Sequence, residues 1–201
     1  MKYLSFILSA LIFMSCNQSS NKNEKQNSND LDKISGKELI ENGFLDYSDS
    51  LRVDSLKNEI IESFNIYSEN NNRFVHIDAE ELSEFNFDFF MPQLNRILSK
   101  RDLRLEIETA IDYDSSNDIL INGQKLKLYT NSELEAGTFW DSAPSNFFKK
   151  VNEILKGQNI KERFYLLYGG NDLHTFLLTE NQFKIISERY KNENNEIPYL
   201  P

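Results

Sequence analysis

Cysteine and histidine are scarce in this chain of 201 residues, which has one cysteine and two histidines. A single cysteine excludes an internal disulfide and any cysteine-cluster metal site, and two histidines exclude the common multi-histidine metal cages. We therefore expect no cofactor and no metal site built on cysteine or histidine, which leaves only a carboxylate site open. Basic residues are also in the minority, because 22 Lys and Arg compare with 32 Asp and Glu, giving a net charge of −10. A whole-chain basic surface is thus missing, and nucleic acid is not an expected partner.

The common catalytic signatures are missing as well. The sequence contains no Gly-x-Ser-x-Gly nucleophile motif, no His-Glu-x-x-His metal motif, no phosphate-binding loop ending in Lys-Ser/Thr and no dinucleotide fingerprint. Hydrophobic residues make up 39% of the chain and aromatic residues 12%, which is enough for a folded core. These features favour a folded, non-enzymatic protein.

The first sixteen residues have the layout of a targeting signal. Lys2 precedes an apolar stretch, Leu4–Met14, and Cys16 follows soon after it. The stretch is shorter than the roughly 20 residues that a membrane-spanning helix needs, but it fits the apolar region of a signal peptide. The segment resembles a bacterial lipoprotein signal, in which the cysteine is lipidated and becomes the new N-terminus. The resemblance implies a signal peptide at 1–15 and a membrane anchor on Cys16. An ordinary cleavable signal with an incidental cysteine is the alternative.

The segment after the cysteine is entirely polar. Residues 17–30 (NQSSNKNEKQNSND) contain no apolar side chain, so we predict that 16–30 comprises the lipidated cysteine and a disordered tether. As a flexible coil, the tether spans about 20 Å. Some bacterial lipoproteins carry Asp after the cysteine as an inner-membrane retention signal, whereas this chain has Asn17. We therefore expect the outer membrane rather than the inner one, with the domain in the periplasm or at the cell surface.

Residues 31–201 are predicted to form one α+β domain, with helices packed on a mixed or mainly antiparallel sheet of five or six strands. Four pairs have the spacing of a helix N-cap and its third residue: Ser35 and Glu38, Asp78 and Glu81, Thr130 and Glu133, and Thr179 and Gln182. Asn122-Gly123 predicts a tight hairpin turn. A second hairpin is predicted from 163–168 and 173–178. Because both of its faces are largely apolar, it should be central in the sheet.

Two short segments are candidates for binding. Gly169, Gly170, Asn171 and Asp172 form the turn of the second hairpin, which is either a binding loop or a simple four-residue turn. Phe139 and Trp140 precede a predicted helix. They are either an exposed recognition anchor or a pair that packs onto the helix.

Two further groups contain residue types that could carry chemistry. His174, next to Asp172 in the sequence, is a candidate general base, but its predicted position opposite Leu167 favours a buried, neutral, hydrogen-bonded histidine. We expect the same structural role for His76. Asp112, Asp114, Ser116 and Asp118 have the alternating spacing of calcium ligands. Asn117 and Gly123 occupy the positions where an EF-hand needs Gly and Glu, so that motif is excluded. An irregular calcium loop and a polar turn remain as alternatives.

Together these features predict a lipid-anchored envelope protein that binds another protein without catalysis. Removing residues 1–15 removes Lys2 and leaves 21 basic against 32 acidic residues, a charge of −11 that favours a basic protein partner. An immunity or inhibitor protein is one concrete form of this function. The alternatives are a hydrolase that uses His174 with nearby carboxylates, and a structural envelope lipoprotein without a discrete ligand.

Overall fold

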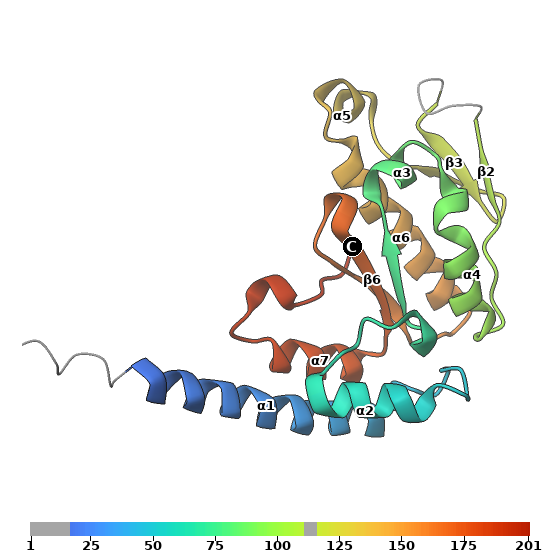
Figure 1. Cartoon of the computed structure of the whole chain (residues 1–201). Coiled ribbons are helices and arrows are strands. Elements are labelled where there is room, and N and C mark those ends of the chain that lie inside the picture. Colours follow the sequence, from blue (N-terminus) through green and yellow to red (C-terminus); the bar gives the residue numbers. More distant parts are fainter. Residues whose placement is uncertain (1–16, 111–115) are drawn as a thin grey trace, which may run out of the picture.

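The computed structural model describes residues 17–110 and 116–201, and it has the predicted α+β architecture (Figure 1). The α-helices in this part of the chain are α1 (Asn17–Glu41), α2 (Val53–Ser63), α3 (Ala79–Ser83), α4 (Met91–Ser99), α5 (Asn131–Ala136), α6 (Phe139–Gly157) and α7 (Glu180–Arg189). The strands are β1 (Phe74–Ile77), β2 (Ile107–Thr109), β3 (Asp118–Ile121), β4 (Gln124–Lys127), β5 (Arg163–Leu167) and β6 (Leu173–Leu178). Short 3-10 helices are η1 (Glu69–Asn71), η2 (Phe87–Phe89), η3 (Gly170–Asp172) and η4 (Asn194–Glu196).

The strands form two antiparallel sheets of three strands each. The first has the order β1-β6-β5 and the second the order β2-β3-β4. The prediction of a single sheet of five or six strands is therefore wrong. Local alternation of apolar and polar residues identifies a strand, but it does not say which neighbour its edge will pair with. Here β2, β3 and β4 pair with one another in the second sheet. The first sheet is therefore completed by β1, which pairs with β6.

Both predicted hairpins are present. Asn122 and Gly123 both have positive φ angles, 49° and 73°, as a two-residue hairpin turn between β3 and β4 requires. In the second hairpin, β6 is the central strand, and Leu167 pairs with His174 as the alternation predicts. The central position of β6 agrees with its apolar residues on both faces, but β5 is an outer strand, so the prediction of a central hairpin holds for β6 alone.

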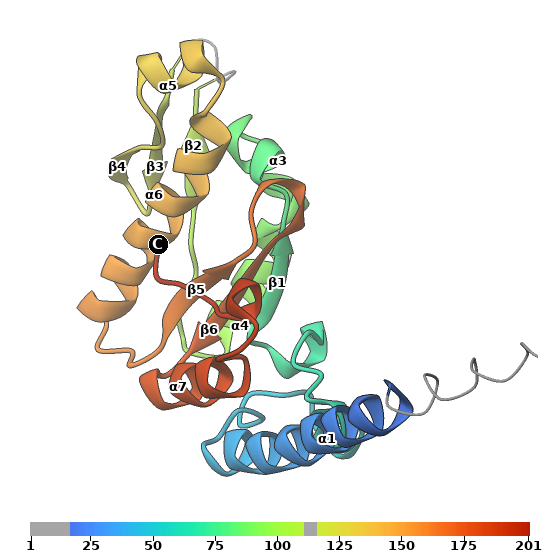
Figure 2. The ribbon, with the colours of Figure 1, turned by 90° about the vertical axis from the view of Figure 1, so that its left-hand side faces the viewer.

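The two faces of the first sheet belong to two hydrophobic cores. Phe164 and Leu177 face a core that also contains residues of α4 and α6. Phe74 and Phe176 face a second core with residues of α1, α2 and α7. Figure 2 shows α6 beside the sheet and α7 and α1 below it. Because helices cover both faces, nearly every residue of β5 and β6 is buried.

Three of the four predicted helix caps are confirmed. The Asp78 carboxylate accepts backbone N–H groups at the start of α3, and Thr130 and Thr179 form capping boxes for α5 and α7. The spacing of Ser35 and Glu38 predicts a helix start, but Ser35 lies buried inside α1. This prediction is wrong because α1 extends back past Ser35. Once a helix is nucleated, each added residue gains a hydrogen bond at little further cost.

The structure also differs from the sequence prediction for residues 17–30. Helix α1 begins at Asn17, so this segment is helical rather than disordered. At 1.5 Å per residue, fourteen helical residues span about 21 Å, close to the length expected for a coil. The predicted signal peptide 1–15 and Cys16 lie outside the described residues. Within the described residues, no helix combines the length and the apolar character needed to cross a bilayer.

Candidate functional site

The glycine-rich turn of the second hairpin lies on the surface. Gly169, Gly170, Asn171 and Asp172 are all exposed, and the last three form η3. A side chain at either glycine would meet open space, so no close neighbour requires them. Gly170 has a φ of 59°, a conformation that favours glycine, whereas Gly169 is extended. A hydrogen bond connects the turn to β1, because the Nε2 atom of His76 lies 2.9 Å from the Asn171 carbonyl oxygen.

The two residues of the Phe139–Trp140 pair differ in burial. Helix α6 begins at Phe139, so both residues lie in its first turn rather than before it. Phe139 is buried, and its ring centroid lies 5.0 Å from that of Tyr129. Trp140 stacks on Phe139 with centroids 5.3 Å apart and remains 40% exposed. Phe139 thus packs in the core, and Trp140 presents an indole face to the surface.

The C-terminal segment brings the turn and the start of α6 to one surface. Tyr199 exchanges two backbone hydrogen bonds with Leu166, of 2.7 and 2.8 Å, and its hydroxyl donates to the Tyr168 carbonyl at 3.2 Å. Partial burial, together with the charge of Asp141, raises the pKa of Tyr199. Tyr199 therefore lies beside the strand that leads into the turn, within reach of the charge of Asp141 in the first turn of α6. Trp140, Tyr168, Tyr199 and Leu200 are all at least 36% exposed, and we call them the aromatic surface.

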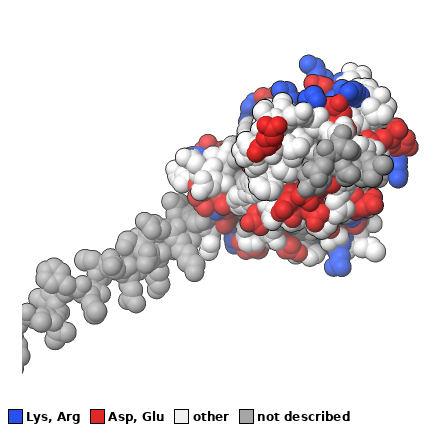
Figure 3. Space-filling view, turned by 90° about the horizontal axis from the view of Figure 1, so that it is seen from above, with Lys and Arg blue, Asp and Glu red and all other residues white. Residues whose placement is uncertain are grey.

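Three segments near this surface contain acidic residues and no basic ones. The segments 74–95, 128–148 and 164–178 contain no Lys or Arg. They carry Asp78, Glu80, Glu81, Glu84, Asp88, Glu133, Glu135, Asp141 and Asp172. Helix α3 contacts both η3 and α6, and α5 contacts α6, so the three segments meet. We call this region the acidic end. Viewed from above, red carboxylates lie across it and basic residues lie at its margin (Figure 3).

The two histidines lie side by side beneath the turn. His76 pairs with His174 across β1 and β6, with ring centroids 5.5 Å apart. His174 is half-buried, and its Nδ1 atom is buried without a hydrogen-bond partner in the described part of the chain. Desolvation, together with the neighbouring His76, lowers the pKa of His174. The expectation of a hydrogen-bonded histidine is therefore not met at Nδ1.

A hydrolytic arrangement around His174 would need a nucleophile that the histidine can deprotonate. Its aromatic neighbours are Tyr67, Phe74 and Tyr168, whose ring centroids lie between 5.1 and 5.6 Å away. The hydroxyls of Tyr67 and Tyr168 both donate to the Glu196 carboxylate instead. The geometry places His174 in an aromatic cluster, and within the described residues no hydroxyl is bound to it.

The predicted acidic turn is only partly described. Asp112 and Asp114 lie outside the described residues. Asp118 forms ion pairs with Lys125 at 2.7 Å and Lys127 at 3.3 Å, and its backbone N–H donates to Ser116 Oγ. Within residues 17–110 and 116–201, no group of three or more His, Cys, Asp or Glu residues is arranged to hold a metal ion.

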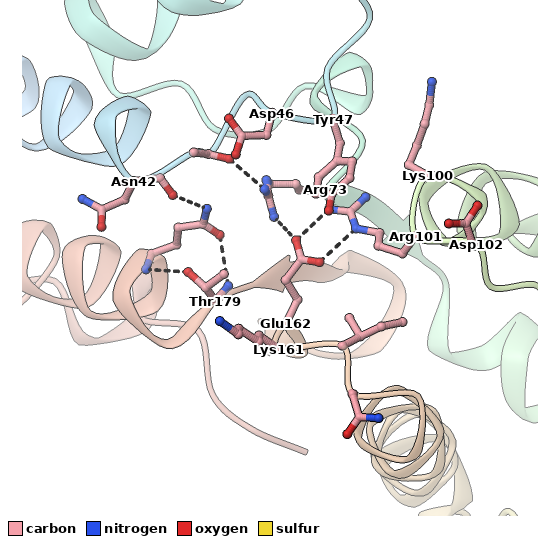
Figure 4. A pocket seen from close by; sticks show the side chains of 14 residues that line it. Asn42, Asp46, Tyr47, Arg73, Lys100, Arg101, Asp102, Lys161, Glu162 and Thr179 are labelled. Atoms are coloured by element: carbon pink, nitrogen blue, oxygen red, sulfur yellow. Dashed lines mark hydrogen bonds and ion pairs between the residues drawn. The ribbon is translucent and has the colours of Figure 1, made fainter.

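The structure also contains a polar cleft of about 450 Å³ (Figure 4). Its lining comes from the segments that follow α1, α4 and α6 and from the start of α7. At its centre, Arg73 and Arg101 both contact the carboxylate of Glu162, which is 2.8 Å from the Arg101 Nη2 atom. The ring of Tyr47 covers Arg101, with the guanidinium carbon 3.8 Å from the ring centroid.

The three charges at the centre of this cleft are engaged by the chain itself. Arg73 also donates to the carbonyls of Gly43, Phe44 and Leu177, and Arg101 donates to those of Asn72 and Ile97. Burial lowers the pKa of Arg73, although the negative charge of Glu162 acts in the opposite direction and raises it. Burial alone would raise the pKa of Glu162, but its bonds to the two arginines outweigh this effect and hold it below the usual value. The cluster therefore joins separate segments of the fold, and its own three charges are balanced by one another and by backbone carbonyls.

No local sequence signal indicates this cluster or the role of Tyr199. Arg73 directly precedes β1 and Glu162 directly precedes β5, but only the order β1-β6-β5 brings those strand starts together. Tyr199 lies beyond the last predicted element, and its pairing with β5 is a long-range contact.

No family model, curated protein or solved structure matches the chain.

Proposed function

We propose that this protein is a lipid-anchored binding module that takes a basic protein partner on its acidic end. The segregation of charge carries the proposal: three segments bring nine acidic residues and no basic ones to the same end. Such a surface attracts a basic partner over distance and repels acidic ones, which increases both the association rate and the specificity.

The aromatic surface supplies binding energy that the charges alone do not supply. Trp and Tyr are the residue types most enriched among those that dominate binding energy at protein interfaces. Trp140 and Tyr168 lie within the acidic segments, and Tyr199 joins them through its bond to Tyr168. Exposed rings bordered by carboxylates match a partner surface that has apolar residues surrounded by Lys and Arg.

The chemistry of the remaining sites favours binding over catalysis. The arginines of the polar cleft bind Glu162 and backbone carbonyls, and the tyrosine hydroxyls near His174 bind Glu196. These groups therefore stabilise the fold.

The position of α1 fits an anchor at the N-terminal side. Helix α1 runs along the lower end of the molecule as drawn, and the acidic end lies at the upper end (Figure 1). An anchor on Cys16 would therefore attach at the end of α1, apart from the acidic end.

Capture of partners from an envelope extract, with matched charge reversals, tests the proposal. Glu80, Glu135 and Asp172 are exposed at the acidic end, and reversing these three charges by substitution to Lys changes the net charge of its three segments from −9 to −3. The control is the triple substitution Glu38→Lys, Glu41→Lys and Asp54→Lys, which makes the same charge change on exposed residues of α1 and α2. We expect the native chain and the control to capture the same basic protein, and the acidic-end variant to lose it. Equal capture by all three, or no basic protein captured by the native chain, would contradict the proposal.

The anchor has a separate test. Changing Cys16 to Ala removes the sulfur that would carry the lipid. We expect the variant protein to leave the membrane fraction or to retain its first fifteen residues. Unchanged mass and unchanged membrane fractionation would show that Cys16 is not the anchor.

A further inference from the structure

The strand β2 has an unpaired edge. It is the outer strand of the second sheet and pairs only with β3 among the described residues. The Asn122 N–H donates to the Glu106 carbonyl, so the backbone of Glu106 faces β3, and that of Glu108 does too by the alternation of the ladder. The N–H and C=O groups of Ile107 and Thr109 therefore point away from the sheet, where no described residue pairs with them.

Other edge positions in the structure are protected. The Asn152 side-chain amide donates a hydrogen bond to the Phe164 carbonyl on β5 and accepts one from the Phe164 N–H. Tyr199 pairs with Leu166 on the same edge. Next to β2, Asn95 likewise takes both backbone groups of Leu105. Natural proteins cover sheet edges in this way to prevent unwanted pairing. The open stretch thus begins just beyond Leu105, at Ile107.

A cleft of about 310 Å³ borders this open edge. Its lining consists of alternate residues of the β2 segment, together with residues from the α3–α4 connection, α4 and η2: Leu105, Ile107, Thr109, Phe85, Asn86, Phe87, Asp88, Met91 and Asn95. The strands appear in the order β4, β3, β2 in Figure 2, with α3 beyond β2. The volume is at the small end of the roughly 300–1,000 Å³ of ligand pockets, and it suits one or two side chains better than a cofactor.

The charges select one kind of occupant. Asp88 is the only charged residue among those lining the cleft. The exposed side chains of Glu106 and Glu108 lie on the opposite face of β2 from Leu105, Ile107 and Thr109, because side chains alternate along a strand. By contrast, the other outer strand, β4, carries Lys125 and Lys127 and repels a basic segment. A strand added beside β2 would therefore place apolar residues over the cleft and basic residues opposite the glutamates.

We propose that an extended segment of the partner, in which apolar residues alternate with Lys or Arg, adds as a fourth strand to the edge of β2. Its backbone pairs with Ile107 and Thr109, its apolar side chains enter the cleft, and its basic side chains face Glu106 and Glu108. Strand addition of this kind draws its affinity from main-chain hydrogen bonds and its specificity from alternate side chains. The inference rests on the proposed binding of a basic protein and names the segment that is recognised.

The test uses the purified full chain and a synthetic peptide, acetyl-Lys-Leu-Lys-Val-Lys-Leu-Lys-Val-Lys-amide. The control peptide has the same composition, with its apolar residues in one block. Thr109→Pro removes an outward N–H at a position where edge strands accept proline, and Thr109→Val keeps the N–H. We expect the alternating peptide to slow amide exchange at Ile107 and Thr109 but not at Glu108. Thr109→Pro should weaken binding about tenfold, as expected for one lost backbone hydrogen bond, with Thr109→Val within about twofold of the native chain.

Several results would overturn the inference. These are no binding of the alternating peptide below about 1 mM, equal binding of the block peptide, or native affinity in Thr109→Pro. The same capture experiment distinguishes a failure of this inference from a failure of the proposed function. If Thr109→Pro still captures the basic partner and the acidic-end reversal does not, the partner binds the acidic end by another route. If the reversal has no effect on capture, the acidic end is not the binding surface.

Discussion

Arg73 and Glu162, which lie 89 positions apart in the chain, form an ion pair in which both side chains are almost fully buried. Arg101 binds the same carboxylate. One carboxylate therefore serves two buried guanidinium groups, and it links the start of β1, the end of α4 and the approach to β5. Removing the negative charge would leave two buried cations without a counter-charge.

Glu162→Gln is expected to destabilise the fold strongly. Breaking a buried ion pair from one side typically costs about 3–5 kcal/mol. The exposed Glu135→Gln serves as the control and should change the free energy of unfolding little. Urea denaturation monitored by tryptophan fluorescence measures both variants. Equal stability of Glu162→Gln and the native chain would show that the ion cluster contributes nothing to the fold.

The same residue predicts part of the acid sensitivity. The pKa of Glu162 is lower in the folded chain than its usual value of 4.5. Its contribution to stability is therefore present above that value and is lost as the pH falls through the lowered pKa. The stability of Glu162→Gln should fall less steeply below pH 4.5 than that of the native chain. Parallel curves would contradict this assignment.

His174 predicts a second pH dependence in a higher range. Its pKa is lowered in the folded chain from 6.5, so the unfolded chain binds the proton more readily. Stability should therefore fall as the pH drops below 6.5 towards the lowered pKa. His174→Gln removes this titrating group, so the free energy of unfolding should depend less on pH below 6.5 in the variant. Unfolding curves measured from about pH 7.5 to about pH 5 provide the comparison, and an unchanged slope in the variant would show that His174 is not responsible.

Gly36 permits the close contact between α1 and α2. A Cβ atom at this position would lie 2.4 Å from the Ile60 carbonyl oxygen, which belongs to the backbone and cannot move aside easily. Gly36→Ala should therefore lower the free energy of unfolding by about 1–3 kcal/mol, as overpacking does. Gly157→Ala is the matched control, since Gly157 is also helical and a Cβ atom there would meet nothing within 4 Å. A neutral Gly36→Ala would mean that the helices separate without cost.

Local features of this fold could be predicted from the sequence, and long-range pairings could not. The Asn122-Gly123 turn, the Thr130 and Thr179 caps and the Leu167–His174 register each depend on residues close together in the chain. The division into two sheets depends on which strand edges meet, and no local pattern encodes this. The extension of α1 past Ser35 likewise overrides a local capping signal.

The candidate surface was predictable to a similar extent. Gly170 and Trp140 stand out in the sequence because glycine turns and exposed aromatics have recognisable local chemistry. Their common surface depends on Tyr199, whose contacts with Leu166 and Tyr168 join distant parts of the chain. The clustering of acidic residues was visible only as a net charge, because its position depends on how three separate segments meet.

Site-specific photo-crosslinking in cells that produce the full chain tests the central claim most directly. A benzophenone amino acid at Trp140 would lie on the aromatic surface, and the same amino acid at Leu51, which is 98% exposed before α2, is the control. The proposed function predicts an adduct with one basic protein from position 140, diminished by the acidic-end reversal, and no such adduct from position 51. No adduct from position 140, or the same adduct from both positions, would contradict it.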